Sequence, residues 1–388
     1  MAHALLSPSS AARWLTCTPS AVLESKCEDV TTDAAREGTE AHMLAELKVQ
    51  RLTGMLSAEE YKKEWKLFNE NSEYYDGEME EATELYADII AEKLNEARER
   101  SKDALAFAEQ EVDLSRVVPG GFGTVDTTII ADGLMEIVDF KYGKGVKVDA
   151  EGNPQLRLYG LGMYLDQSIF YKIERVCMTI VQPRLGNISS EEMSVADLME
   201  WGAKVVAPKA ELAAKGEGEF VPGEVQCRFC KAKTLCRARA EENLKTARED
   251  FALPPELSTD EVAELLPKLD ELQAWAKDLQ EWAQDQAVNH GVTFKGYKVV
   301  AGRSNRKYSD EGAVAEKLLA SGYEHDDIFE EKLLRITQME KLLGKKNTAE
   351  LIGDLIEKPA GKPTLVPESD RRPAINSAEA AAKDFKEE

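Results

Sequence analysis

The feature that most constrains the fold is a pair of short apolar runs within residues 121–142, separated by Asp132-Gly133. Both runs are rich in β-branched residues, and an Asp-Gly pair between such runs is a strong signal for a two-residue β-hairpin. Counting outward from this turn brings Asp126 opposite Asp139. The sequence therefore predicts two carboxylates that face each other on one side of an antiparallel pair, with Cβ atoms roughly 5 Å apart.

Two carboxylates placed in this way repel each other unless a positive charge lies between them. Lys141 follows Asp139 by two residues and so projects from the same face of the strand. A divalent cation would remove the repulsion, and carboxylate oxygens suit Mg²⁺ or Mn²⁺. The alternative is a structural acidic pair neutralised by Lys141. A metal ion beside a lysine suits phosphodiester hydrolysis, because the ion activates water and the lysine stabilises negative charge on phosphate.

The segments around this hairpin predict an α/β fold. Short apolar runs indicate further strands, and longer periodic segments indicate helices. We expect strands at 107–114 and 175–183 and helices at 31–51, 57–103, 195–214 and after Asn153-Pro154, which is a typical helix start. We expect one domain over 1–250 with a helical insertion at about 52–104, a mainly helical domain over 251–357, and a disordered tail over 358–388.

A cysteine cluster at 227–236 indicates a second metal site. Cys227, Cys230 and Cys236 follow the pattern C-x2-C-x5-C, so a fourth ligand must come from elsewhere in the chain. Thiolates bind Zn²⁺ or an iron–sulfur cluster, and the spacing alone does not separate the two. Cys177 lies in an apolar run and is expected to be an ordinary buried thiol.

Several of these motifs together resemble the PD-(D/E)XK nucleases, and in particular their RecB-like branch. Asp126 followed by Asp139-Phe140-Lys141 resembles the D…(D/E)xK motif of that family. The stretch from Gly38 to His42 resembles its G-x-x-x-H motif, and the stretch from Gln155 to Tyr159 resembles its Q-x-x-x-Y motif. Glu109 stands where the family often carries another acid, with Glu111 as the alternative. The motifs occur in the family's order.

The resemblance implies a PD-(D/E)XK core, which is a small mixed sheet flanked by helices, with a helical C-terminal extension. It implies that Mg²⁺ or Mn²⁺ binds to His42, Asp126, Asp139 and the Phe140 carbonyl. It further implies that Lys141 and Glu109 act in catalysis beside Asp126 and Asp139, and that three residues contact DNA, namely Gln155, Tyr159 and Lys144.

The same resemblance suggests what the cysteines hold. AddB-type nuclease domains and CRISPR-associated RecB-like exonucleases place one cysteine before the nuclease motifs and C-x2-C-x5-C after them. Cys17 matches the first position, with Cys27 as the alternative. The resemblance thus implies a [4Fe-4S] cluster on Cys17, Cys227, Cys230 and Cys236 that acts as a structural staple, and Zn²⁺ is the alternative.

Overall charge limits how such a protein meets DNA. The chain has 49 basic and 72 acidic residues and a net charge of −23, which excludes a histone-like protein that coats duplex DNA. We therefore expect a local basic groove around Lys141, Lys144, Lys147 and Arg157. No run reaches the roughly 18 apolar residues of a membrane span, and the N-terminus lacks a signal-peptide pattern, so a cytoplasmic protein without a membrane partner is expected.

The expected function is a metal-dependent DNA nuclease, more specifically an exonuclease. The whole layout also resembles an uncharacterised phage and prophage family, which implies a role in DNA recombination, repair or replication in the host cytoplasm. A single-strand-binding or annealing protein is the partner that this resemblance implies. The competing hypothesis is a non-catalytic, metal-stapled protein that binds DNA ends or assembles a recombination complex.

Overall fold

The structure is a computed structural model that describes residues 4–28, 31–249, 259–300, 308–329 and 333–356. The chain divides into two units, residues 1–299 and residues 300–388. The first unit therefore extends beyond the expected boundary at residue 250 and includes the helix α11 (Thr259–Asn289).

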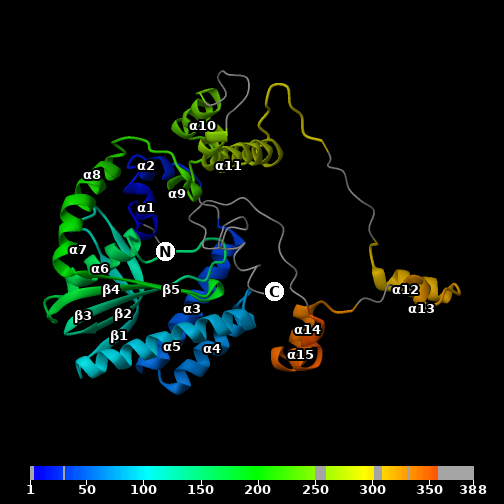
Figure 1. Cartoon of the computed structure of the whole chain (residues 1–388), viewed down its shortest axis with the longest axis horizontal. Coiled ribbons are helices and arrows are strands. Elements are labelled where there is room, and N and C mark those ends of the chain that lie inside the picture. The colour runs from blue at the N-terminus through cyan, green and yellow to red at the C-terminus, as the bar shows by residue number, and fades with distance from the viewer. Residues whose placement is uncertain (1–3, 29–30, 250–258, 301–307, 330–332, 357–388) are drawn as a thin grey trace, which may run out of the picture. The chain divides into compact units, whose positions relative to one another are not determined.

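A five-stranded mixed sheet lies at the centre of the first unit (Figure 1). Its strands are β1 (Leu105–Asp113), β2 (Phe122–Ala131), β3 (Gly133–Phe140), β4 (Ile173–Gln182) and β5 (Asn187–Ser194), and they lie side by side in that order. Strands β3 and β4 are parallel, and every other neighbouring pair is antiparallel. The expected α/β class with a small mixed sheet and flanking helices is therefore confirmed. Strand β5 was not expected from the sequence.

The β2–β3 hairpin has the register that its turn predicts, from Ala131 opposite Leu134 to Thr127 opposite Val138. Gly133 adopts φ 83°, a conformation that favours glycine. The ladder ends at the Thr127–Val138 pair, one residue before the two aspartates would meet. The strands thus bring both aspartates to the end of the hairpin without a regular pair between them.

Helices cover both faces of the sheet. Helices α3 (Asp33–Thr53) and α5 (Gly77–Arg100) contact β1 and β2 on one face, and α4 (Ala58–Asn71) packs on α3. Helix α6 (Pro154–Gln167) connects β3 to β4 and lies on the other face, followed by α7 (Val195–Trp201), a π-helical turn (Gly202–Val206) and α8 (Ala207–Lys215). A separate hydrophobic core fills each interface.

Helix α6 is the element that carries the predicted Gln155 and Tyr159, and two features hold it in place. Asn153 caps it by accepting hydrogen bonds from the backbone N–H groups of Gln155 and Leu156, as the Asn-Pro start predicts. Gly162 allows close packing on β1, because a Cβ there would lie 2.3 Å from Cγ2 of Val112. Helix α6 is therefore held against the sheet both at its start and further along its length.

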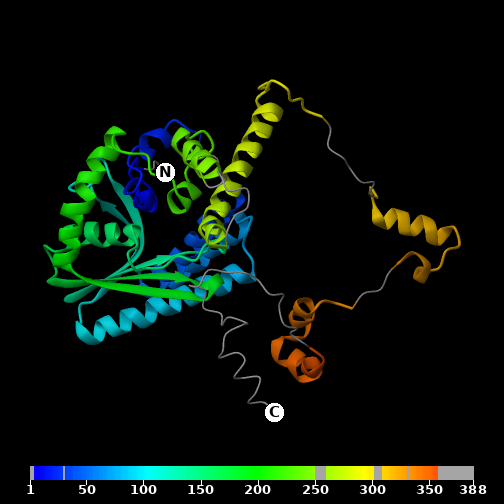
Figure 2. The same ribbon diagram turned by 45° about the horizontal axis from the view of Figure 1, so that its top comes forward.

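The N-terminal segment packs against a segment about 200 residues away in the chain (Figure 2). The N-terminal elements are the 3-10 turn η1 (Pro8–Ser10), α1 (Ala11–Trp14) and α2 (Ser20–Glu24), and α1 contacts α9 (Glu224–Arg228). The Thr18 hydroxyl donates to the Glu217 carbonyl at 2.6 Å, and Glu24 accepts from the Lys231 backbone N–H at 2.7 Å. These contacts bring the expected first cysteine to the cysteine cluster.

Helix α11 joins the first unit through α10 (Arg237–Glu249). The side chain of Arg239 is 2% exposed and forms ion pairs with Glu271 at 2.6 Å and Asp278 at 2.7 Å. A buried arginine with two carboxylate partners is strongly held, because breaking either pair would leave a buried charge.

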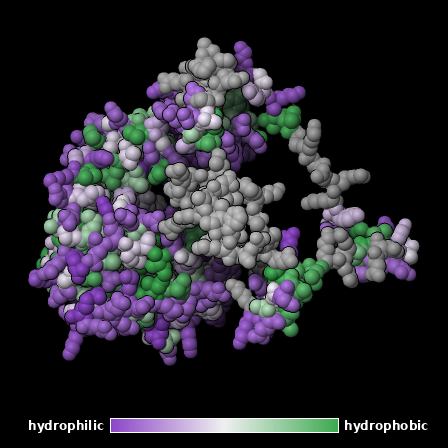
Figure 3. Space-filling view, in the orientation of Figure 1, coloured by the Kyte–Doolittle hydropathy of each residue, from purple (hydrophilic) through white to green (hydrophobic). Residues whose placement is uncertain are grey.

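The described elements of the second unit are all helical. They are α12 (Glu311–Ala320), α13 (His325–Ile328), α14 (Ile336–Leu343), α15 (Lys345–Ile352) and the 3-10 turn η4 (Gly353–Leu355). The expected disordered tail at 358–388 lies outside the described residues. Among the described helices, none has the length and apolar character needed to span a bilayer. Most of the surface in Figure 3 is hydrophilic, in keeping with the high content of charged residues.

Candidate functional site

Three acidic residues occupy neighbouring strands at one level of the sheet. Glu109 on β1 lies opposite Asp126 on β2, because the residues before and after it pair in register with β2. Asp139 lies on β3, just beyond the last β2–β3 pair. Glu109 has φ 48°, the only positive φ among the described residues other than glycine. Such backbone strain is uncommon and concentrates at functional sites.

Helix α3 brings His42 to these acids. Its Nδ1 atom lies 3.3 Å from Oδ1 of Asp126, and its ring packs edge-on against Phe140, with centroids 5.4 Å apart. One ligand atom each from His42, Glu109 and Asp126 lie within 4.8 Å of one another. One imidazole nitrogen and two carboxylate oxygens form a suitable donor set for Mn²⁺ or Mg²⁺.

Asp126 is held in place by the backbone of the next strand. The Phe140 N–H donates to its Oδ2 atom at 2.6 Å, which explains why the regular ladder stops before this position. Burial raises the pKa of Asp126, but the nearby positive charge and hydrogen bond of His42 outweigh it and lower the pKa below its usual value. Asp126 is therefore a carboxylate at neutral pH.

Asp139 belongs to a second, adjoining group. The Lys141 ammonium lies 2.9 Å from Oδ2 and 3.2 Å from Oδ1 of Asp139. The Gln155 side chain donates to Oδ1 at 3.1 Å and accepts from Lys141 at 3.3 Å. Burial lowers the pKa of Lys141, but the charges of Asp139 and Asp126 outweigh it and raise the pKa. Lys141 is therefore a fixed cation beside the histidine–carboxylate cluster.

The structure places the two glutamates of β1 in different surroundings. Glu109 lies with His42 and Asp126, whereas Glu111 is exposed. Burial, and next the charge of Asp126, raise the pKa of Glu109 to about 7. Glu46 also contributes to that shift. Sequence reasoning missed Glu46, although its spacing of four residues from His42 places both on one face of α3.

The expected DNA-contacting residues are only partly brought together. The Gln155 side chain donates to Asp139 and, at 3.4 Å, to the hydroxyl of Tyr159, so both residues border the site. Lys144 instead forms an ion pair with Glu78 at 2.8 Å, at the start of α5.

Each of the four cations expected to form a basic groove has an acidic partner. The four are Lys141, Lys144, Lys147 and Arg157. Lys147 pairs with Asp149 at 2.9 Å, and Arg157 donates to Glu191 on β5 at 2.9 Å. These pairs reduce the positive potential around the site, so the four residues do not form an unneutralised basic patch.

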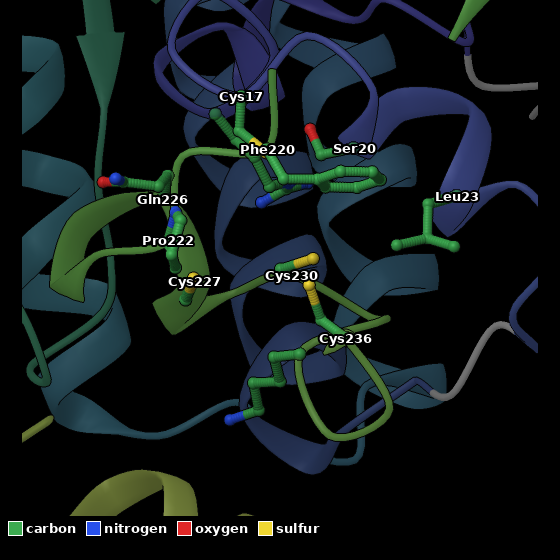
Figure 4. A pocket seen from close by; sticks show the side chains of 11 residues that line it. Cys17, Ser20, Leu23, Phe220, Pro222, Gln226, Cys227, Cys230 and Cys236 are labelled. Carbon is green, nitrogen blue, oxygen red and sulfur yellow. The ribbon is translucent and has the colours of Figure 1, made fainter. Parts of the chain in front are cut away.

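The four cysteines expected to form a cluster line a single pocket, which Figure 4 shows. Its sulfur-bearing residues are Cys17 from the N-terminal segment and Cys227, Cys230 and Cys236. Cys27 does not line this pocket, and its thiol donates to the Leu23 carbonyl at 3.8 Å. Of the two candidates for the first position, the structure therefore places Cys17 with the cluster.

Backbone N–H groups point at two of these sulfurs. The backbone N–H of Val221 donates to the sulfur of Cys17 at 3.5 Å, and that of Gly223 to the sulfur of Cys227 at 3.4 Å. Four thiolates around one Zn²⁺, each at about 2.3 Å, would bring the sulfurs to roughly 3.8 Å from one another. Among the described residues, no three cysteine sulfurs lie within 4.8 Å of one another. The sulfurs in this structure are therefore not arranged as a zinc tetrahedron.

The fold and the site define an α/β protein whose mixed sheet carries a histidine–carboxylate cluster beside a lysine, together with a separate four-cysteine pocket. The chain belongs to the DUF2800 family, described as proteins of unknown function, whose family model matches residues 3–373. A solved structure, the crystal structure of SSO0001, matches at 14% sequence identity over 59% of this chain and 96% of that one, with a TM-score of 0.22. At this TM-score the match does not define the fold.

Proposed function

We propose that this protein is a DNA nuclease that depends on Mg²⁺ or Mn²⁺ and has a PD-(D/E)XK-type core. The observation that carries the proposal is the convergence of His42, Glu109 and Asp126 within 4.8 Å, beside Lys141 on the adjacent strand. The reaction is the hydrolysis of a phosphodiester. Water adds to phosphorus, a phosphorus–oxygen bond breaks, and the leaving oxygen takes up a proton.

In this proposal the protein holds both the ion and the charge that develops on phosphate. His42, Asp126 and Glu109 would hold the ion, which when bound supplies an activated water and polarises the phosphate. Asp139 and Gln155 orient the Lys141 ammonium through contacts of 2.9–3.3 Å. A cation fixed in advance stabilises the charge of the transition state without having to reorganise.

We also propose that the four-cysteine pocket holds a [4Fe-4S] cluster with a structural role. Two observations support this proposal, namely the shared pocket and the N–H groups directed at two sulfurs. Hydrolysis needs no electron transfer. The cluster would instead reinforce the contact between the N-terminal segment and residues 217–236.

Cleavage of end-labelled DNA tests the nuclease proposal. Single and double strands labelled at the 5′ or 3′ end are incubated with the full chain and Mg²⁺ or Mn²⁺. We expect cleavage by the wild type, loss of cleavage in Asp126→Asn and Lys141→Ala, and normal cleavage in the control Glu111→Gln, which changes an exposed acid of the same sheet.

The non-catalytic hypothesis gives a different pattern. If the acids are purely structural and Lys141 only neutralises them, the wild type binds DNA but cuts none with either ion. Lys141→Ala then destabilises the fold, because it leaves buried Asp139 uncompensated. That result would overturn the nuclease proposal.

A further inference from the structure

A groove next to the cysteine pocket borders the candidate site, and Arg13 lines both. It has a volume of about 880 Å³, and Gln155 lines it, so the groove meets the group formed by Lys141 and Asp139. Its other walls come from the N-terminal segment, the loop before α6, and the segment that carries two of the clustered cysteines. These walls lie within residues 4–25, 146–155 and 225–231.

Basic residues outnumber acids in the lining of the groove, although the whole chain has a net charge of −23. The lining has one acid, Glu24, and four basic residues, which are Arg13, Lys147, Arg228 and Lys231. Arg13 pairs with Glu24 at 2.5 Å inside the groove. Lys147 and Arg228 pair with acids outside the lining. Exposed ion pairs of that kind are weak and exchange readily for a phosphate partner.

The groove also offers an aromatic face and hydroxyl groups. Phe229 lines it and is 69% exposed, although it stands between two cysteines of the buried cluster. An exposed aromatic ring in a basic groove is a typical stacking surface for an unpaired base. In the N-terminal part of the lining, the Ser7 hydroxyl lies 3.1 Å from that of Ser9 and 2.9 Å from that of Ser10. Serine hydroxyls commonly donate hydrogen bonds to phosphate oxygens.

We propose that this groove binds a single strand of DNA and leads it to the candidate site, with a base stacked on Phe229 and phosphates beside Lys147 and the N-terminal serines. This inference deepens the nuclease function proposed above and rests on it for the choice of substrate. The exposed ring of Phe229 favours a single strand, because unpaired bases are free to stack on an aromatic side chain, whereas the bases of a duplex are already paired and stacked.

Binding without metal tests the proposal independently of cleavage. Fluorescence anisotropy with the full chain in EDTA compares a labelled 12-nucleotide single strand with the matched duplex. We expect Phe229→Ala to weaken single-strand binding about tenfold, and Phe229→Tyr, which keeps the ring, to restore it. The control Phe170→Ala removes a ring that is 76% exposed and does not line the groove, so it should leave binding unchanged.

The salt dependence of binding is a second measurement that does not touch the cysteine region. For single strands, each phosphate contact adds about 0.7 to the slope of log K against log salt. Lys147→Ala should therefore reduce the slope by about 0.7. The control Lys172→Ala, which removes an exposed lysine outside the groove, should not change it.

The outcomes separate this inference from the proposed activity. If wild type cuts DNA in an Asp126-dependent way, but Phe229→Ala and Lys147→Ala bind the single strand as wild type does, the groove is not the strand's path and the inference is wrong. Tighter binding of the duplex than of the single strand would also overturn it. If both variants lose binding while the wild type cuts nothing with either ion, the groove stands and the nuclease proposal fails.

Discussion

Divalent metal should stabilise the wild-type fold, and Asp126→Asn should remove most of that stabilisation. A ligand that binds only the folded state at 100 times its Kd adds about 2.7 kcal/mol. At about 2–4 °C per kcal/mol for a domain of this size, the melting temperature should rise by about 5–11 °C. The variant loses one of the three ligand atoms that converge within 4.8 Å, so we expect a shift close to zero at the same Mn²⁺ concentration.

Without metal the same substitution should cost little. The Asp126→Asn side chain would lose the charge that faces His42 at 3.3 Å, but its amide oxygen can still accept the Phe140 N–H. The substitution also relieves repulsion from the neighbouring acids, so the net change should stay within about 1 kcal/mol. The assay is thermal unfolding in EDTA and along a Mn²⁺ titration, with Glu111→Gln as the control. Equal Mn²⁺ shifts in the wild type and Asp126→Asn would refute the metal site.

Three further predictions concern the cysteine pocket, Glu109 and the packing of α6. Cys17→Ala should lose bound iron and melt at a lower temperature, whereas the control Cys177→Ala should do neither. Stoichiometric zinc without iron in anaerobically purified protein would contradict the iron–sulfur cluster. Burial raises the pKa of Glu109 from 4.5 to about 7. In the metal-free protein, the preference of the folded state for protonated Glu109 contributes stability in full below pH 4.5, and this contribution is lost as the pH rises through 7. The melting temperature of Glu109→Gln should therefore rise relative to that of the wild type between about pH 5 and about pH 8. A difference in melting temperature that does not change with pH would contradict this prediction. Gly162→Ala should lower the free energy of unfolding, measured with denaturant, by about 1–3 kcal/mol, because the added Cβ would overlap a β1 side chain. Gly38→Ala, which adds its Cβ in open space on a helix, should raise the free energy of unfolding by about 0.5–1 kcal/mol.

Local rules predicted much of the site. The Asp-Gly turn set the β2–β3 register, because a two-residue loop leaves one way to pair the strands. The Asn-Pro start of α6 placed Gln155 on the first turn of that helix, where it reaches Asp139. Spacing alone could not identify a fourth cysteine. The family resemblance did so, and contacts between segments about 200 residues apart bring Cys17 to the pocket.

Other features depend on tertiary contacts that no local pattern encodes. The positive φ of Glu109 and the hydrogen bond from Phe140 to Asp126 both interrupt regular pairing, so counting residues could not reveal them. Asp139 turns to Lys141 and Gln155 and stays outside the histidine–carboxylate cluster. Strand β5 escaped prediction because it is a polar edge strand whose Ile188 is 56% exposed. Lys144 pairs with Glu78 on a helix far away in the sequence.

The most direct test of the central claim places one phosphorothioate linkage in a labelled DNA strand. Sulfur is a poor ligand for Mg²⁺ and a better one for the softer Mn²⁺. If an ion held by His42, Glu109 and Asp126 contacts the scissile phosphate, cleavage at that linkage should fall sharply with Mg²⁺ and recover with Mn²⁺, and Asp126→Asn should cut with neither ion. Equal cleavage of the modified and unmodified linkages in Mg²⁺, or no cleavage of any DNA by the wild type with either ion, would contradict it.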